Sequence, residues 1–182
     1  AQGGPGDLYL NVHPSHLLAV RSDHGHVFER ILQQCGLGPE QIVLEIAEHT
    51  LNDKQRLRAA ITAWQSRGYR IAVDHFSGQQ TKVQNVLALN PQLIKIAGEK
   101  MCKSIASEKA IAQLQATVRR IRAAGVEVIF IAANSELCWE LACNVDFDAV
   151  QGPAQGPSIP QTQDWYAHNA ELIHKAGKKR HA

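Results

Sequence analysis

Residues 42–46 read Ile-Val-Leu-Glu-Ile, and residues 93–96 read Leu-Ile-Lys-Ile. Each run is short, rich in β-branched residues and apolar except for one charge, which is typical of a strand buried on both faces of a parallel sheet. Similar runs occupy residues 8–12, 69–73, 126–131 and 149–151. The chain is therefore predicted to contain six strands of one parallel sheet.

Longer segments between the predicted strands have apolar residues at intervals of three and four, the spacing of an amphipathic helix. They lie in residues 27–32, 57–64, 83–89, 111–121, 135–143 and 163–175. Alternating strands and helices predict a β/α architecture, but six units are fewer than the eight of a complete barrel. The sequence lacks the glycine-rich dinucleotide and P-loop motifs. The predicted fold class is α/β, a TIM-like barrel that is incomplete, with about six β/α units in this chain.

The composition fits one globular domain, because 45% of the 182 residues are hydrophobic and the net charge is +2. We expect a linker in residues 1–7, preceded by further sequence, a domain in residues 8–176 and a basic tail in residues 177–182. Nucleic-acid binding is not expected from so short a basic segment, and no apolar run is long enough to span a membrane. The four cysteines have no metal-binding spacing and are expected to be reduced thiols.

Polar residues stand where the predicted strands end, the edge that carries function in a β/α barrel. Asn11 ends the first strand, Glu45 the second and Asp74 with His75 the third, and Gln151 lies on the sixth. Amide, carboxylate and imidazole groups gathered at one edge could hold Mg²⁺ or Mn²⁺. Each residue could instead satisfy a neighbouring loop or helix end, and the sequence leaves both readings open.

Lys95 is the sharpest single signal, because it interrupts an otherwise apolar strand. A buried ammonium group is costly unless it has a partner of opposite charge. We expect a carboxylate such as that of Asp74 to be this partner.

Five short motifs, in order along the chain, resemble those of the EAL domain family, whose active members cleave cyclic di-GMP with two divalent metal ions. The motifs are Leu10-Asn11-Val12-His13, Leu44-Glu45-Ile46-Ala47-Glu48, Val73-Asp74-His75-Phe76, Ile94-Lys95-Ile96-Ala97 and Gln151-Gly152 with Pro160. The resemblance implies metal-ligand positions at Asn11, Glu45 and Asp74. It also places Lys95 near the attacking water and Gln151 in support. Glu48 matches the acid that anchors the loop after the third strand.

Three departures from the family pattern concern its acidic residues. His75 stands where the family has a second aspartate, and Ala133 stands where it has a further acid. The first two strands of the family, with the Glu-Ala-Leu signature and its metal-binding glutamate, have no counterpart here. Two-metal hydrolysis needs both ions, and a neutral imidazole is a poor substitute for a carboxylate on a hard cation. We therefore expect no enzyme, with Lys95 and Gln151 as catalytic remnants and Asn11, Glu45, Asp74 and His75 as remnant metal positions.

The expected function is that of an inactive, EAL-like regulatory module in cyclic-di-GMP signalling, acting by protein contact or by sensing a ligand. No cofactor is expected, unless the remnant positions still bind Mg²⁺ or Mn²⁺. The expected partner is another protein, an upstream domain of the same chain, a second copy in a homodimer, or cyclic di-GMP itself. The family implies the bacterial cytoplasm. The alternative is a residual metal-dependent cyclic-di-GMP phosphodiesterase that upstream sequence completes.

Overall fold

The computed structural model describes residues 6–18, 24–51, 54–98, 101, 108–131 and 136–152. One six-stranded sheet runs through this part of the chain, in the order β1-β2-β3-β4-β5-β6, and every neighbouring pair is parallel. The strands are β1 (Leu8–Asn11), β2 (Ile42–Ala47), β3 (Arg70–Phe76), β4 (Leu93–Ala97), β5 (Glu127–Ile131) and β6 (Ala149–Gln151). The prediction of an incomplete, TIM-like β/α barrel is confirmed, since a closed one needs eight strands.

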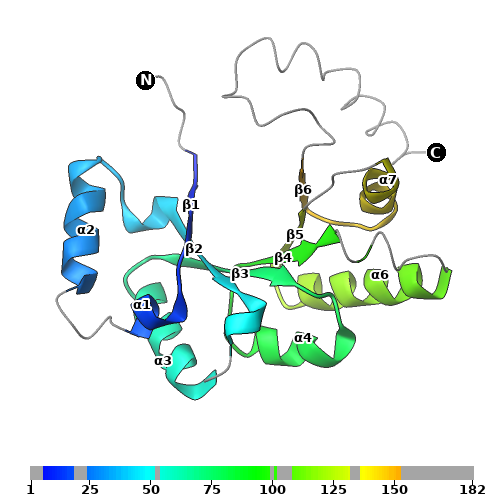
Figure 1. Ribbon diagram of the computed structural model, residues 1–182, viewed down its shortest axis with the longest axis horizontal. Helices are drawn as coiled ribbons and strands as arrows, with labels where there is room; N and C mark the ends of the chain where they lie inside the picture. The colour runs from blue at the N-terminus through cyan, green and yellow to red at the C-terminus, as the bar shows by residue number, and fades with distance from the viewer. Residues whose placement is uncertain are drawn as a thin grey trace, which may run out of the picture.

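Helices lie around the outer side of the strands (Figure 1). They are α1 (Pro14–Leu18), α2 (His24–Gln34), α3 (Lys54–Gln65), α4 (Gln80–Leu87), α6 (Glu108–Ala123) and α7 (Glu136–Asn144), with short 3-10 turns η2 (Pro39–Gln41) and η3 (Glu48–Thr50). The sequence analysis missed α1, because Pro14 was expected only to end β1. Proline is well suited to the first turn of a helix, where its missing N–H has no partner to lose.

Three expectations from the sequence lie wholly or partly outside the described residues. They are the linker in residues 1–7, of which only the last two are described, the helix in 163–175 and the basic tail in 177–182. In the part of the chain that is described, no helix has the length and apolarity needed to cross a bilayer.

The two faces of the sheet are packed differently. The outward face carries the main core, in which Leu44, Ile96 and Phe130 are buried against helix residues such as Ile61 and Val118. On the other face, Val43, Ala72 and Leu93 form a small separate cluster with Ile129 beside it. Because side chains alternate between faces along a strand, the next inner residues toward the strand ends include Glu45, Asp74 and Lys95. The inner face therefore changes from apolar to charged toward the carboxyl edge.

The cysteine expectation needs a correction. Cys35 and Cys143 are exposed thiols, as a reduced state allows, but Cys138 is buried in α7 and disulfide-bonded. Spacing along the chain does not show which cysteines the fold brings together, so this bond could not be predicted from the sequence.

The outer core predicts a difference between two isoleucines. Replacing Ile96, which is fully buried, by alanine should lower the free energy of unfolding by about 2–5 kcal/mol, because the cavity cannot fully collapse. Ile31 on α2 is 51% exposed, and its replacement by alanine should change stability by less than about 0.5 kcal/mol. Urea denaturation of both variants measures the two values, and equal losses would contradict the assignment of the core.

An aromatic cluster joins α2 to α3 and β3. The Trp64 ring centroid lies 4.8 Å from that of Tyr69 and 5.9 Å from that of Phe28. Tyr69 is almost fully buried, and its hydroxyl has no hydrogen-bond partner among the described residues. Burial, assisted by the nearby Glu29 carboxylate, raises the pKa of Tyr69 to about 12.

This raised pKa predicts a loss of stability in alkali. Between pH 10 and about 12 the unfolded chain releases the Tyr69 proton while the folded protein retains it, so stability falls as the pH rises through this window. Tyr69→Phe should remove that part of the alkaline loss and should be neutral or stabilising at pH 7, because no hydrogen bond is broken. Thermal unfolding of both proteins at a series of pH values checks this, and identical alkaline profiles would refute it.

Candidate functional site

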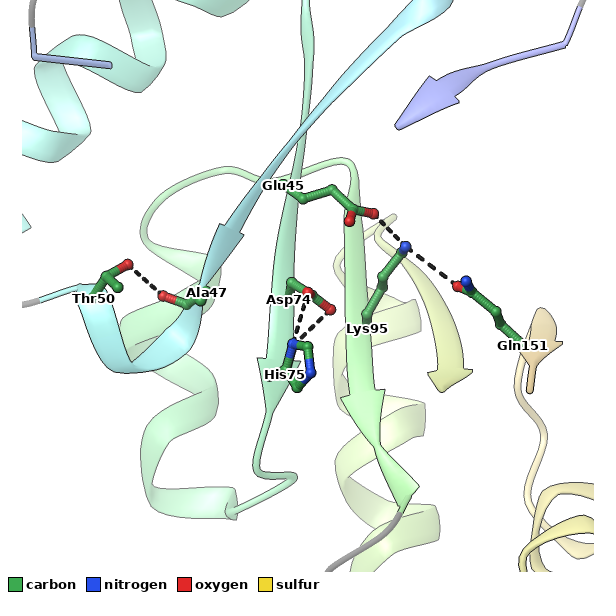
Figure 2. Close-up of polar contacts among 7 residues, drawn as sticks. All are labelled: Glu45, Ala47, Thr50, Asp74, His75, Lys95 and Gln151. Atoms are coloured by element: carbon green, nitrogen blue, oxygen red, sulfur yellow. Dashed lines mark hydrogen bonds and ion pairs between the residues drawn. The ribbon is translucent and has the colours of Figure 1, made fainter. Parts of the chain in front are cut away.

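Lys95 lies at the centre of the polar part of the inner face. Its ammonium group forms an ion pair with Glu45 Oε1 on β2, and both side chains are only 7% exposed. Gln151 on β6 offers its Oε1 at 3.4 Å from Lys95 Nζ, on the other side (Figure 2). The lysine thus connects two strands that do not pair with β4.

The partner of Lys95 is therefore Glu45, and the expectation that Asp74 would take this place is wrong. Glu45 and Lys95 face each other across β3 because both belong to the inner face. Lys95 is the only partner of Glu45 Oε1 within the described residues. The sequence signal for a paired buried lysine was correct, but strand pairing was needed to choose between two nearby carboxylates.

Tyr9 on β1 completes the surroundings of the ammonium group, with its ring centroid 4.5 Å from Lys95 Nζ. Burial, and then the neighbouring Asp7 carboxylate, raise the pKa of Tyr9, so its ring is neutral at ordinary pH. Sequence reasoning missed this residue. The signal was present, because Tyr9 lies two positions before Asn11 and so faces the same side of the strand.

Asp74 is engaged by the residue that follows it. Its Oδ1 accepts a hydrogen bond from the backbone N–H of His75 at 2.8 Å, and its Oδ2 lies 2.7 Å from His75 Nδ1. His75 has a positive φ of 55°, uncommon for a residue other than glycine, where the pairing of β3 with β4 is irregular. Its side chain is 64% exposed, while that of Asp74 is buried. The carboxylate therefore fixes a solvent-facing imidazole at the strand end.

Glu48 contacts the loop that follows β3. Its Oε2 accepts a hydrogen bond from the backbone N–H of Ser77 at 2.7 Å, and its Oε1 forms an ion pair with Lys82 at 2.7 Å. These contacts join η3 to the start of α4, as the predicted role of loop anchor requires. The role itself stays a prediction, and the contact with Lys82 was not predicted from the sequence.

The predicted metal positions do not form a site ready for a divalent ion. Asn11 pairs in register with Glu45, so two of them are neighbours at the carboxyl edge. In the described part of the chain, however, no three His, Cys, Asp or Glu side chains gather as metal ligands. Glu45 is paired with Lys95, and Asp74 with His75. Ala133, the lost acid position, lies outside the described residues.

A comparison with protein-family models shows the family to which the chain belongs. The model described as "EAL domain" matches residues 2–158, most of the chain. The chain belongs to the EAL domain family. An uncharacterised EAL-domain protein of Bacillus subtilis, YkuI, is 31% identical over 78 residues, 41% of this chain and 19% of the relative. The chain thus spans about a fifth of that curated protein.

Solved EAL structures share the fold. The B. subtilis YkuI structure, in complex with substrate c-di-GMP and calcium, has a TM-score of 0.74 at 18% identity, over 96% of this chain and 43% of that one. Klebsiella pneumoniae BlrP1, with manganese and cyclic di-GMP, gives 0.72 at 22% identity, over 82% and 38%. The PaMucR phosphodiesterase, with c-di-GMP, gives 0.70 at 17% identity, over 85% and 62%.

These comparisons correct the expectation that the chain is not an enzyme. The chain belongs to the EAL domain family, and it shares its fold with the PaMucR phosphodiesterase. The expectation rested on replaced ligands alone, counted within a chain that covers 38% to 62% of the EAL structures with which it was compared. Replacements at single positions do not decide activity when the remaining ligands and partners of a site lie in other parts of a fold.

The Lys95–Glu45 pair predicts strong coupling between two substitutions. Lys95→Met should lower the free energy of unfolding by about 3–5 kcal/mol, because it leaves Glu45 buried without a counter-charge. The double variant E45M/K95M should recover most of this loss, because no charge is left buried. As a control, Lys82→Met, at a lysine whose side chain is 46% exposed, should cost less than about 1 kcal/mol. Urea denaturation gives all values, and purely additive losses would exclude a coupled pair.

Proposed function

We propose that this chain binds cyclic di-GMP at the carboxyl ends of β2, β4 and β6 and serves cyclic-di-GMP signalling as part of an EAL domain. The observation that carries the proposal is the buried ammonium group of Lys95, held between Glu45 and Gln151 at this edge. β/α barrels bind their ligands at the carboxyl edge of the strands. A cation there suits the phosphate groups of a cyclic dinucleotide.

The two partners of Lys95 leave room for a third. Gln151 is exposed, and its contact with Lys95 Nζ is long at 3.4 Å. A phosphate oxygen can replace the amide oxygen of Gln151 beside the ammonium group, where a charge-assisted bond is stronger than a neutral one. The Gln151 side chain can then turn its NH₂ toward the same phosphate, because an amide both accepts and donates. Glu45 holds the Lys95 side chain in place.

The ligand bound in three structurally similar proteins supports this assignment. YkuI, BlrP1 and PaMucR were each solved with cyclic di-GMP. They share the fold of this chain at low sequence identity, so the ligand itself is proposed here on the Lys95 cluster and on membership of the family.

A second proposal is metal-dependent hydrolysis of cyclic di-GMP, with upstream sequence completing the site. One observation in support is that Asn11 and Glu45, two of the predicted metal positions, are neighbours in the sheet. The other is that the structurally similar PaMucR is a phosphodiesterase. The described side chains do not fit a divalent ion as they are arranged, because Lys95 and His75 occupy the carboxylates. No reaction step is therefore assigned to a metal, and hydrolysis is left to the assay below.

A protein contact is the remaining proposal, with an upstream domain or a second copy as partner and the bacterial cytoplasm as setting. Its support is the β1 edge of the sheet. Leu8, Leu18, Val27 and Ile31 are exposed apolar side chains on β1, α1 and α2. An edge strand also presents unpaired backbone groups, which another chain can use.

Calorimetric titration tests the ligand proposal. Cyclic di-GMP added to the chain should bind with a dissociation constant of about 1 μM or lower, about −8 kcal/mol. Gln151→Ala should weaken binding by about tenfold, or roughly 1.4 kcal/mol. Gln33→Ala, at an exposed glutamine on α2, should leave affinity unchanged. Titrations with manganese and with a chelator show whether binding depends on a metal.

The outcomes separate the three proposals. Heat that Gln151→Ala reduces supports ligand binding at the Lys95 cluster. Linear dinucleotide in the manganese sample, detected by chromatography, supports hydrolysis. No heat at high ligand concentration excludes the ligand proposal and leaves the protein contact at the β1 edge.

A further inference from the structure

Tyr9 and Lys95 approach each other from distant parts of the sequence. Tyr9 lies on the edge strand β1 and pairs in register with Val43, so its side chain belongs to the inner face. From there its ring centroid reaches to 4.5 Å from Lys95 Nζ. A cation within about 6 Å of an aromatic face is attracted by the ring quadrupole.

The three partners of Lys95 restrain its side chain to different degrees. Glu45 supplies charge and holds the ammonium group from β2, and Tyr9 covers it from β1. Gln151, on β6, contacts it at the longer distance of 3.4 Å. A lysine side chain has four rotatable carbon bonds and loses about 1.5–2 kcal/mol of rotamer freedom when it is fixed, so one ion pair leaves its direction poorly defined. A second contact removes that freedom.

We infer that Tyr9 is a positioning residue for Lys95, whose ring closes the β1 side of the ammonium group and directs its open side toward Gln151 and the ligand phosphate. The inference rests on the proposed function for its ligand, the phosphate of cyclic di-GMP. Tyr9 acts through Lys95 and is given no contact with the ligand.

The ring face carries this role and the hydroxyl group does not. Tyr9→Phe keeps the ring and should preserve the contact. Tyr9→Leu keeps an apolar side chain that suits an inner strand position but has no π-face, so it should lose the contact. Leu8 is a matched control, because it is the preceding residue of β1, points to the opposite face and is exposed to a similar degree, 39% against 37% for Tyr9.

The first measurement is calorimetric titration of cyclic di-GMP into four proteins. Tyr9→Leu should weaken binding by about five- to thirtyfold, the range expected for loss of a cation–π contact. Tyr9→Phe should stay within about twofold of the wild type, and Leu8→Ala should not alter affinity. If Tyr9→Phe binds as weakly as Tyr9→Leu, the ring face is not what positions Lys95, and the inference is overturned.

The second measurement needs no ligand. An amine-reactive acetylating ester is added to the folded proteins, and the rate of modification at each lysine is read by peptide mass spectrometry. Lys95 should react much more slowly than Lys82, whose side chain is 46% exposed against 7%. Tyr9→Leu should accelerate acetylation of Lys95 relative to Lys82 in the same sample, and Tyr9→Phe should not.

The two measurements separate the inference from the proposed function. If the wild type fails to bind cyclic di-GMP but Tyr9→Leu still exposes Lys95 to acetylation, the proposed ligand is wrong and the positioning by Tyr9 stands. If Tyr9→Leu changes neither affinity nor the acetylation of Lys95, the positioning role is excluded.

Discussion

The ammonium group of Lys95 lies on the inner face of the sheet, where an unpaired charge would cost several kcal/mol. Its partners come from β1, β2 and β6. Strands that are distant in sequence must therefore come close together for the buried ammonium group to be stabilised. The sheet has to curl for these side chains to meet, because β4 pairs with none of the three strands. The ammonium group of Lys95 therefore lies at the carboxyl edge of the sheet, where β/α barrels bind their ligands.

Two further carboxylates near this edge of the sheet, those of Asp74 and Glu48, also contact neighbouring polar groups. Asp74 contacts His75, and the partly buried Glu48 contacts Ser77 and Lys82, so both carboxylates have partners among the described residues. Replaced positions alone therefore say little about what this edge of the sheet binds.

The fold could be predicted from the sequence because its signals are local. Apolar runs of strand length, separated by segments of helical periodicity, predicted the six strands that the structure describes. Lys95 within such a run predicted a buried ion pair. The identity of its partner could not be predicted, since Glu45 and Asp74 lie on adjacent strands and only the register separates them. Tyr9 was missed because an aromatic residue in a strand has an ordinary explanation as part of the core. The disulfide of Cys138 was missed because a bond between cysteines depends on which side chains the fold brings together.

The strictly sequential order of the strands has a consequence for how the chain reaches its folded state. Each parallel pair joins strands that follow one another in the sequence, so no strand of the described chain has to pair with one further along. The paired strands are nevertheless joined by crossovers that contain helices, and the loop-closure entropy lost before such a pair forms makes parallel pairing slow. The contact between Lys95 and Gln151, which spans 56 positions, joins two strands that do not pair with each other, so it depends on β5 being in place between them.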